Sequence, residues 1–288
     1  MNDMFRPSAA SAITAAYDKD GYYFPHDVLS EAEAAALVAD LKAAEAECAG
    51  QRAKLSLLRS YPAQLLPSYA GLIRHPRLLE AASQIIGPDV LVWSCGFFIK
   101  EAASKSFVSW HQDLNYWGLD GDDEVTAWVA LTPATVETGC MRFVPGSHLK
   151  RDVPHVDKFA PDNLLTRGQE IAVEVDEASA VNVLLRAGQA SFHHGHIFHA
   201  SGPNTTNARR LGVAIRYVAP SMKQVSGDRL LVSLVSGEDR YGHFEHMPAP
   251  AGRLREEDWA RAKRNADMKK DILYQGVKAE LVKANRRG

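Results

Sequence analysis

A histidine and an aspartate stand two residues apart in WHQDLNYWGL, the stretch that begins at Trp110. Side chains at positions i and i+2 of a β-strand point to the same face. A strand here would therefore place His111 and Asp113 on one face and turn Gln112 away. An imidazole beside a carboxylate in an apolar setting can ligate a metal ion. A solvent-exposed strand edge is the alternative, because the H-x-D triplet is common by chance.

The stretch FHHGHIFHASGPNTTNARR holds four histidines in seven consecutive residues: His193, His194, His196 and His199. Strand alternation cannot aim all four at one ion, so some of them must line a pocket or lie on the surface. His199 differs from the other three because Ser201, a Gly-Pro-Asn turn and then two arginines come directly after it in the chain.

Those two arginines, Arg209 and Arg210, directly precede the apolar strand pattern LGVAIRYV. A guanidinium that points inward without a partner would be costly. A carboxylate that accepts two hydrogen bonds would remove that cost. No acidic residue lies nearby in the sequence, so the expected partner is either a distant Asp or Glu or the carboxylate of a ligand.

The elements that must position these residues begin with helices. Ser30 and Glu33 have the spacing of a capping box, which predicts a helix over residues 30–50 with Gly50 as its stop. Pro76 suits the first turn of a second helix, over residues 75–88. Roughly residues 253–288 return to helix, with acidic residues at the start and basic residues towards the end, as the helix dipole favours.

From Val90 onward the chain changes to short segments rich in β-branched and aromatic residues, divided by Gly, Pro and Asp turns. Such segments without alternating helices predict a mostly β fold with flanking helices and a double-stranded β-helix core, that is, a cupin-like jelly roll. We expect a single domain over residues 1–288: a helical lead (1–89), the jelly-roll core (90–220) and a C-terminal cover segment with a helix (221–288). Lys100, at the end of a strand, is expected to extend its ammonium to solvent.

The composition limits the classes of partner. The chain has 288 residues, 46% of them hydrophobic and 24% charged, with a formal net charge of −2, so no global field attracts nucleic acid or acidic membrane. Three separated cysteines without a CxxC pair, and the lack of a long apolar run, favour a cytoplasmic protein. We expect a small-molecule substrate, and the charged C-terminal helix leaves a homodimer open.

The order of these motifs resembles a known family. An H-x-D pair, a distal histidine and an arginine eleven residues beyond it are similar to the non-haem iron, 2-oxoglutarate-dependent oxygenases, and most of all to the phytanoyl-CoA dioxygenase family. HQDLNYW, AWVALTPATVETGCMRFVPGSH and HASGPNTTNARR resemble that family's signatures, and the similarity runs roughly from Tyr17 to Pro220. It implies that His111, Asp113 and His199 bind Fe(II) and leave positions open for 2-oxoglutarate and O2.

The same resemblance assigns cosubstrate residues. Arg210 would bind the distal carboxylate of 2-oxoglutarate, Ser201 would add a hydrogen bond, and Trp128 would line the pocket or pack in the core. Arg209 is the second candidate for the carboxylate, but strand alternation puts it on the other face. Phe98 stands where some relatives have an amide residue, so the contacts of the metal-proximal carboxylate stay open.

The expected reaction is hydroxylation of a C–H bond of a small metabolite or natural-product intermediate, with decarboxylation of 2-oxoglutarate to succinate. Asp113 disfavours halogenation, because related halogenases have a small residue there; desaturation and ring formation remain possible. Tyr116 and Trp117 are expected at the rim of the substrate pocket. Two alternatives are a cupin-type metalloenzyme that does not use 2-oxoglutarate and a non-catalytic jelly roll that binds a small molecule.

Overall fold

The computed structural model describes residues 11–151, 153–158, 160, 162–165, 168–225 and 229–273. Its helices are α1 (Ala12–Asp20), α2 (Glu31–Glu47), α3 (Arg52–Ser60), α4 (Pro62–Leu65), α5 (Pro67–Leu72), α6 (Pro76–Ile86) and α7 (Glu256–Leu273). None of them is long and apolar enough to cross a membrane. The predicted helix at the C-terminus is present as α7, and the part of that prediction beyond residue 273 lies outside the described residues.

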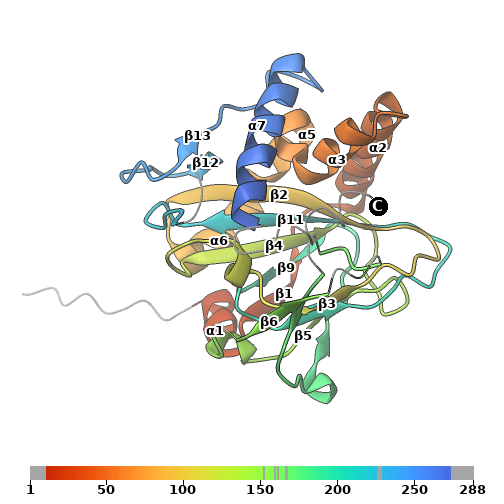
Figure 1. The fold of residues 1–288 in the computed structure, drawn as a ribbon, viewed down its shortest axis with the longest axis vertical. Helices are drawn as coiled ribbons and strands as arrows, with labels where there is room; N and C mark the ends of the chain where they lie inside the picture. The colour runs from red at the N-terminus through yellow and green to blue at the C-terminus, as the bar shows by residue number, and fades with distance from the viewer. Residues whose placement is uncertain are drawn as a thin grey trace, which may run out of the picture.

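Two β-sheets form the centre of the molecule (Figure 1). The larger has the order β1 (Tyr22–Asp27), β9 (Gln189–His193), β4 (Glu124–Ala130), β11 (Arg210–Val218), β2 (Val90–Lys100), β12 (Leu231–Ser236), β13 (Glu245–His246). The smaller has the order β3 (Val108–His111), β10 (His199–Ser201), β5 (Met141–Phe143), β8 (Val181–Asn182), and β6 (His155–Asp157) pairs with β7 (Gln169–Ile171). Side chains of the two main sheets line one cavity, so the sheets face each other, and the predicted jelly roll is confirmed.

Alternation along β11 gives the large sheet two different faces. Leu211, Val213, Ile215 and Tyr217 pack in the apolar core with the helices, whereas Arg210, Gly212, Ala214 and Arg216 face the other sheet. The hydrophobic packing of the large sheet therefore lies on the side that faces the helices. The opposite face is left free for polar side chains.

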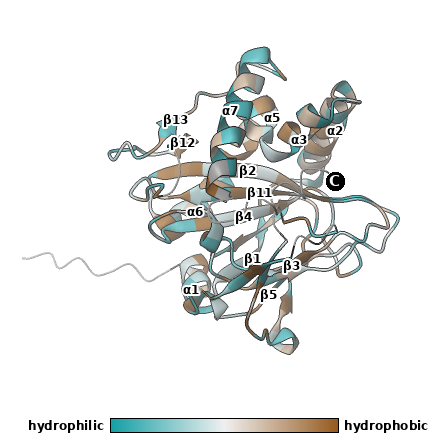
Figure 2. Cartoon of the chain, viewed as in Figure 1, coloured by the Kyte–Doolittle hydropathy of each residue, from teal (hydrophilic) through white to brown (hydrophobic). Residues whose placement is uncertain are grey.

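The helices cover the outer face of the large sheet, with α2, α3, α5 and α7 beside β2 in Figure 1. Figure 2 shows hydrophobic residues along β2 and β11 and hydrophilic residues along much of α7. At the start of α2 the Ser30 hydroxyl accepts from the Glu33 amide and the Glu33 carboxylate accepts from the Ser30 amide, so the predicted capping box is confirmed. Pro76 opens α6 as predicted, and Gly87 is its C-cap.

Gly188 precedes β9 and joins it to the chain before α2. Its φ is +87°, and its carbonyl accepts from the amides of Val28 (3.1 Å) and Leu29 (2.9 Å). A Cβ at this position would collide with the Leu29 carbonyl group. Only glycine adopts this backbone without strain.

We predict that Gly188→Ala lowers the free energy of unfolding by more than about 1–2 kcal/mol, the usual cost of left-handed backbone in an L-residue. The matched control is Gly71→Ala, in α5, where an added Cβ meets nothing within 4 Å and φ is not positive. The control should leave stability unchanged or raise it. Urea denaturation measures both, and equal losses would contradict the assignment.

Candidate active site and metal centre

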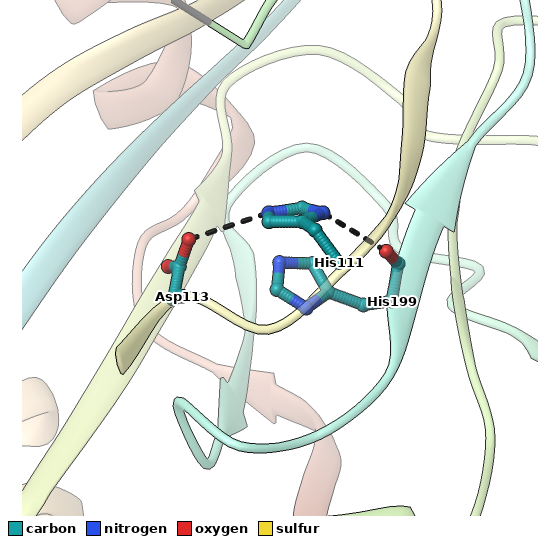
Figure 3. Close-up of side chains that lie close together, drawn as sticks. All are labelled: His111, Asp113 and His199. Atoms are coloured by element: carbon teal, nitrogen blue, oxygen red, sulfur yellow. Dashed lines mark hydrogen bonds and ion pairs between the residues drawn. The ribbon is translucent and has the colours of Figure 1, made fainter. Parts of the chain in front are cut away.

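Two paired strands of the small sheet bring the candidate ligands together. β3 and β10 are antiparallel, and His199 lies directly opposite His111 with 3.9 Å between ring centroids (Figure 3). Asp113 adds its carboxylate, and one donor atom from each residue lies within 4.8 Å of the others. Among the described residues this is the one such group of histidine, cysteine and acidic side chains.

The geometry of Asp113 differs from the prediction. β3 ends at His111, and Asp113 has helical dihedrals (φ −69°, ψ −48°) at the start of the 3-10 turn η1 (Leu114–Tyr116). The two side chains therefore do not share a strand face, and the turn directs the carboxylate to within 3.3 Å of His111 Nε2 instead. Gln112 does point away: it is buried, and its amide donates to the carbonyls of Lys150 and His196.

Backbone carbonyls orient both imidazoles. His111 Nδ1 donates to the carbonyls of Ser109 (2.9 Å) and His199 (3.1 Å), and His199 Nδ1 donates to that of Ile197 (3.0 Å). A carbonyl only accepts, so Nδ1 carries the proton in each ring. The Nε2 lone pairs stay available for a metal, the arrangement typical of metal-binding histidines.

The charges of the three residues suit a cation. Burial opposes ionisation of Asp113, but the charge of the Arg216 guanidinium, 3.5 Å away, holds its pKa well below the usual value. Burial and the neighbouring His111 keep the pKa of His199 low. Two imidazoles and a carboxylate on one side of an ion fit ferrous iron and leave its other positions open.

Two buried cations lie beside each other near this site: Arg210, which lines the same cavity, and Lys100, which is buried next to it outside the lining. Arg210 is 2% exposed; its Nη1 donates to the Gly139 carbonyl (3.1 Å), and its guanidinium lies over the Trp128 ring, 5.1 Å from the centroid. Lys100, opposite it across β2 and β11, donates to the Ser201 hydroxyl (2.7 Å). The expectation that Lys100 reaches solvent is wrong, because its side chain is fully buried beside Arg210.

Neither cation has an acidic partner among the described residues. Arg210 Nε is buried without a hydrogen-bond acceptor in that part of the chain. Burial, and then the charge of Arg210, lower the pKa of Lys100 to about 7, and burial lowers the pKa of Arg210 to about 10. The Lys100 ammonium donates all three of its N–H groups, to the Ser201 hydroxyl and to the Gly139 and Gly202 carbonyls. Arg210 keeps an N–H without an acceptor in that part of the chain, which is a donor that a carboxylate would satisfy.

Neighbouring residues show why Arg210 and not Arg209 enters the cavity. Arg209 lies on the outer side, where its guanidinium pairs with Glu45 (2.7 Å) and Glu101 (3.0 Å). Gly212, two residues after Arg210 on the inner face, leaves the space that the Trp128 indole fills, since an added Cβ would overlap that ring.

A row of polar side chains crosses the large sheet beside the candidate ligands. Thr126 pairs with His193 on β9 and with Arg216 on β11. Thr126 Oγ1, His193 Nδ1 and Arg216 Nε are buried, line the cavity and have no hydrogen-bond partner among the described residues. Burial lowers the pKa of His193 to about 3, so its ring is neutral at neutral pH. Sequence patterns did not predict this row, because only the strand register reveals it.

A second cavity, of about 270 Å³, opens on the other side of His111 and Asp113. Tyr116 and Trp117 line it, and Phe98 lies between the two cavities. His194 and His196 line neither cavity; His194 instead lies near Asp122 and Glu124. The candidate residues thus form three groups. These are the possible metal ligands His111, Asp113 and His199, the buried cations Lys100 and Arg210, and the residues that line the second, larger cavity.

Two curated proteins are similar to this chain over about half of its length. The chain is 28% identical to the "Ectoine dioxygenase" of Streptomyces anulatus over 51% of this chain and 54% of that protein. It is 26% identical to the "L-proline trans-4-hydroxylase" of Streptomyces griseoviridis over 51% and 62%. The chain thus spans about half of the first relative's length and three-fifths of the second's.

Among solved structures, the apo non-heme monooxygenase ThoJ superposes with a TM-score of 0.81 at 33% identity, over 94% of this chain and 99% of that one. CytC3 with Fe(II) and alpha-ketoglutarate shares the fold, with a TM-score of 0.64 at 20% identity over 88% and 97%. The family description "Phytanoyl-CoA dioxygenase" matches residues 17–212, a range that contains the donor triad, Lys100 and Arg210. The chain therefore belongs to the phytanoyl-CoA dioxygenase family.

Proposed function

We propose that this chain is an Fe(II)- and 2-oxoglutarate-dependent dioxygenase that hydroxylates an unactivated C–H bond of a small metabolite or natural-product intermediate. The observation that carries the proposal is one cavity with a two-histidine, one-carboxylate donor set and the buried guanidinium of Arg210, whose Nε has no acceptor among the described residues. The balanced reaction consumes the substrate C–H, O2 and 2-oxoglutarate and yields C–OH, succinate and CO2. We take residues 1–288 to act as one oxygenase domain.

His111, Asp113 and His199 would hold the iron, which when bound supplies the oxidising power for C–H cleavage and open positions for 2-oxoglutarate and O2. Arg210 and Lys100 would bind the distal carboxylate, with Ser201 ordered by Lys100 and with Trp128 stacked on the guanidinium. Thr126, His193 and Arg216 offer polar atoms where the metal-proximal carboxylate needs partners. The apolar residues Phe98, Val108 and Ala214 limit water in this cavity.

Two alternatives are less well supported. A cupin-type enzyme that does not use 2-oxoglutarate would leave Lys100 and Arg210 buried without an anion. A non-catalytic binding protein would have no need of the neutral imidazole of His199 and the ionised carboxylate of Asp113 on one side of a small space. Asp113 also occupies the position that a halide would need, which supports hydroxylation over halogenation.

We predict that His111→Ala weakens Fe(II) binding and lowers succinate formation by more than about 100-fold, since even the loss of an outer partner of a metal ligand costs about 10–100-fold. Anaerobic equilibrium dialysis measures the iron and chromatography the succinate. His246→Ala is the matched control, because this histidine pairs with Asp239 and its side chain is 43% exposed. Unchanged iron binding in His111→Ala would exclude the proposed centre.

We predict that Arg210→Ala raises the Kd for 2-oxoglutarate by about 30-fold or more, as expected when one partner of a buried charge pair is removed. Calorimetry on the Mn(II)-loaded protein measures this affinity without turnover. Arg209→Ala, on the outer side of the same strand end, should leave the Kd unchanged. Equal effects of the two substitutions would argue against a carboxylate site at Arg210.

The buried ammonium of Lys100 predicts a pH dependence. With its pKa lowered to about 7 in the free protein, Lys100 is protonated below that pH and loses its proton above it. A bound carboxylate favours the protonated form, so binding takes up a proton above pH 7, and the Kd should rise by up to about tenfold per pH unit there. In Lys100→Met the affinity should be weaker and this rise should disappear. A rise that survives in Lys100→Met would assign it to another group.

A further inference from the structure

The second cavity beside the candidate iron site has an aromatic wall. Tyr61, Trp93, Phe97, Phe98, Tyr116 and Trp117 contribute to it, and Leu164 and Leu165 add apolar surface. His111 and Asp113 form its inner end. At about 270 Å³ it lies near the lower limit of ligand pockets, which favours a small and largely apolar substrate.

The charges on this cavity are mostly positive. Three cations line it, Arg59, Arg216 and Lys269, against one carboxylate, that of Asp113. Arg59 already pairs with Glu45 (2.8 Å), and Arg216 lies 3.5 Å from Asp113. Lys269 has neither an ion pair nor a hydrogen bond within the described part of the chain. Its ammonium lies over the ring of Trp93, with Nζ 4.0 Å from the centroid.

A stack of rings connects Lys269 to the candidate iron site. Trp93 stacks on Trp117 with 4.9 Å between centroids, and the guanidinium of Arg216 lies 5.5 Å from the centroid of Trp117. Lys269 therefore lies at one end of the tryptophan pair, and Arg216, next to Asp113, at the other. Burial, and then the charge of Arg216, lower the pKa of Lys269 to about 7, while the carboxylate of Asp113 acts in the opposite direction.

The element that carries Lys269 is α7, the C-terminal helix, which packs on α3 and α4 over the large sheet (Figure 1). Most of its charged side chains are solvent-exposed, for example Lys263, which pairs with Asp267 (2.6 Å) and is 68% exposed. Lys269 differs because it is turned into the cavity and onto an indole face. Of the three cations that line this cavity, Lys269 is thus the one without an ion pair in the described part of the chain.

We propose that this cavity binds a small organic acid, with its carboxylate at Lys269 and its apolar part against Phe98 and Trp117. The C–H bond to be oxidised then faces His111 and Asp113. This inference rests on the proposed function for its chemistry, but the binding it describes does not depend on turnover. An amine substrate is disfavoured, because it would meet three cations and one carboxylate that is engaged as a metal ligand.

The test uses graded probes, phenylacetate, 3-phenylpropionate and 4-phenylbutyrate, each with its neutral amide. The holoprotein is loaded with Mn(II) and 2-oxoglutarate, and binding is followed by calorimetry and by tryptophan fluorescence, since Trp93 and Trp117 line the cavity. We expect at least one acid to bind about tenfold or more tightly than its amide, as for a hydrogen bond to a charged group. Equal affinities, or no binding of any acid at millimolar concentration, would overturn the proposal.

Substitutions at Lys269 test whether this residue causes the preference for an acid over its amide. Lys269→Gln should abolish it, Lys269→Arg should retain it, and Lys269→Glu should shift binding towards 3-phenylpropylamine. Lys263→Gln, on the same helix but in solvent, is the matched control and should behave as the unsubstituted protein. An acid preference that survives in Lys269→Gln would refute the assignment, as would phenyl phosphate binding more tightly than every carboxylate.

A failure of the proposal for Lys269 can be distinguished from a failure of the proposed function. Iron and 2-oxoglutarate binding should be unchanged in all Lys269 variants, because Lys100 and Arg210 bind the cosubstrate on the far side of the candidate ligands. Loss of acid preference with intact 2-oxoglutarate binding supports the role of Lys269. Loss of both, together with a changed circular dichroism spectrum, would mean that Lys269 supports the fold and would overturn its role in binding.

Discussion

The antiparallel contact between β3 and β10 sets His199 opposite His111, and the rest of the site is arranged around this pair. Backbone carbonyls at three positions keep both rings in the tautomer that presents Nε2. This orientation comes from main-chain atoms of β3, of β10 and of the bend before β10, and not from other side chains. The turn η1 then adds the carboxylate of Asp113 from outside the strand.

An imbalance of charge extends through the interior on both sides of these three side chains. Lys100 and Arg210 lie on one side and Lys269 on the other, and both cavities share Arg216 and the carboxylate of Asp113. Buried cations without partners are costly. Arg210 Nε has no acceptor in the described part of the chain, so burial of this guanidinium costs stability that a bound anion would offset.

The fold tolerates buried charges because the two faces of the large sheet have different roles. The outward side chains of β11 and β4 join the helices in a continuous apolar core, which excludes water without using the inner face. The inner face has little spare room. Because Gly212 has no side chain, the Trp128 ring fits beside it and covers Arg210. The inner face is therefore closely packed as well as polar.

Local patterns in the sequence determined much of this structure. Alternation placed Arg210 inward and Arg209 outward, and the capping residues Ser30 and Glu33 began α2. β2 begins at Val90, where the strand-rich part of the chain was expected to start, and ends at Lys100. These features depend on neighbours within a few residues, which a sequence displays directly. Tertiary structure alone decided the turn at Asp113, the burial of Lys100, the row of Thr126, His193 and Arg216, and the place of Lys269. Each of these depends on strand register or on packing between segments up to 170 residues or so apart, and no local periodicity encodes such distances.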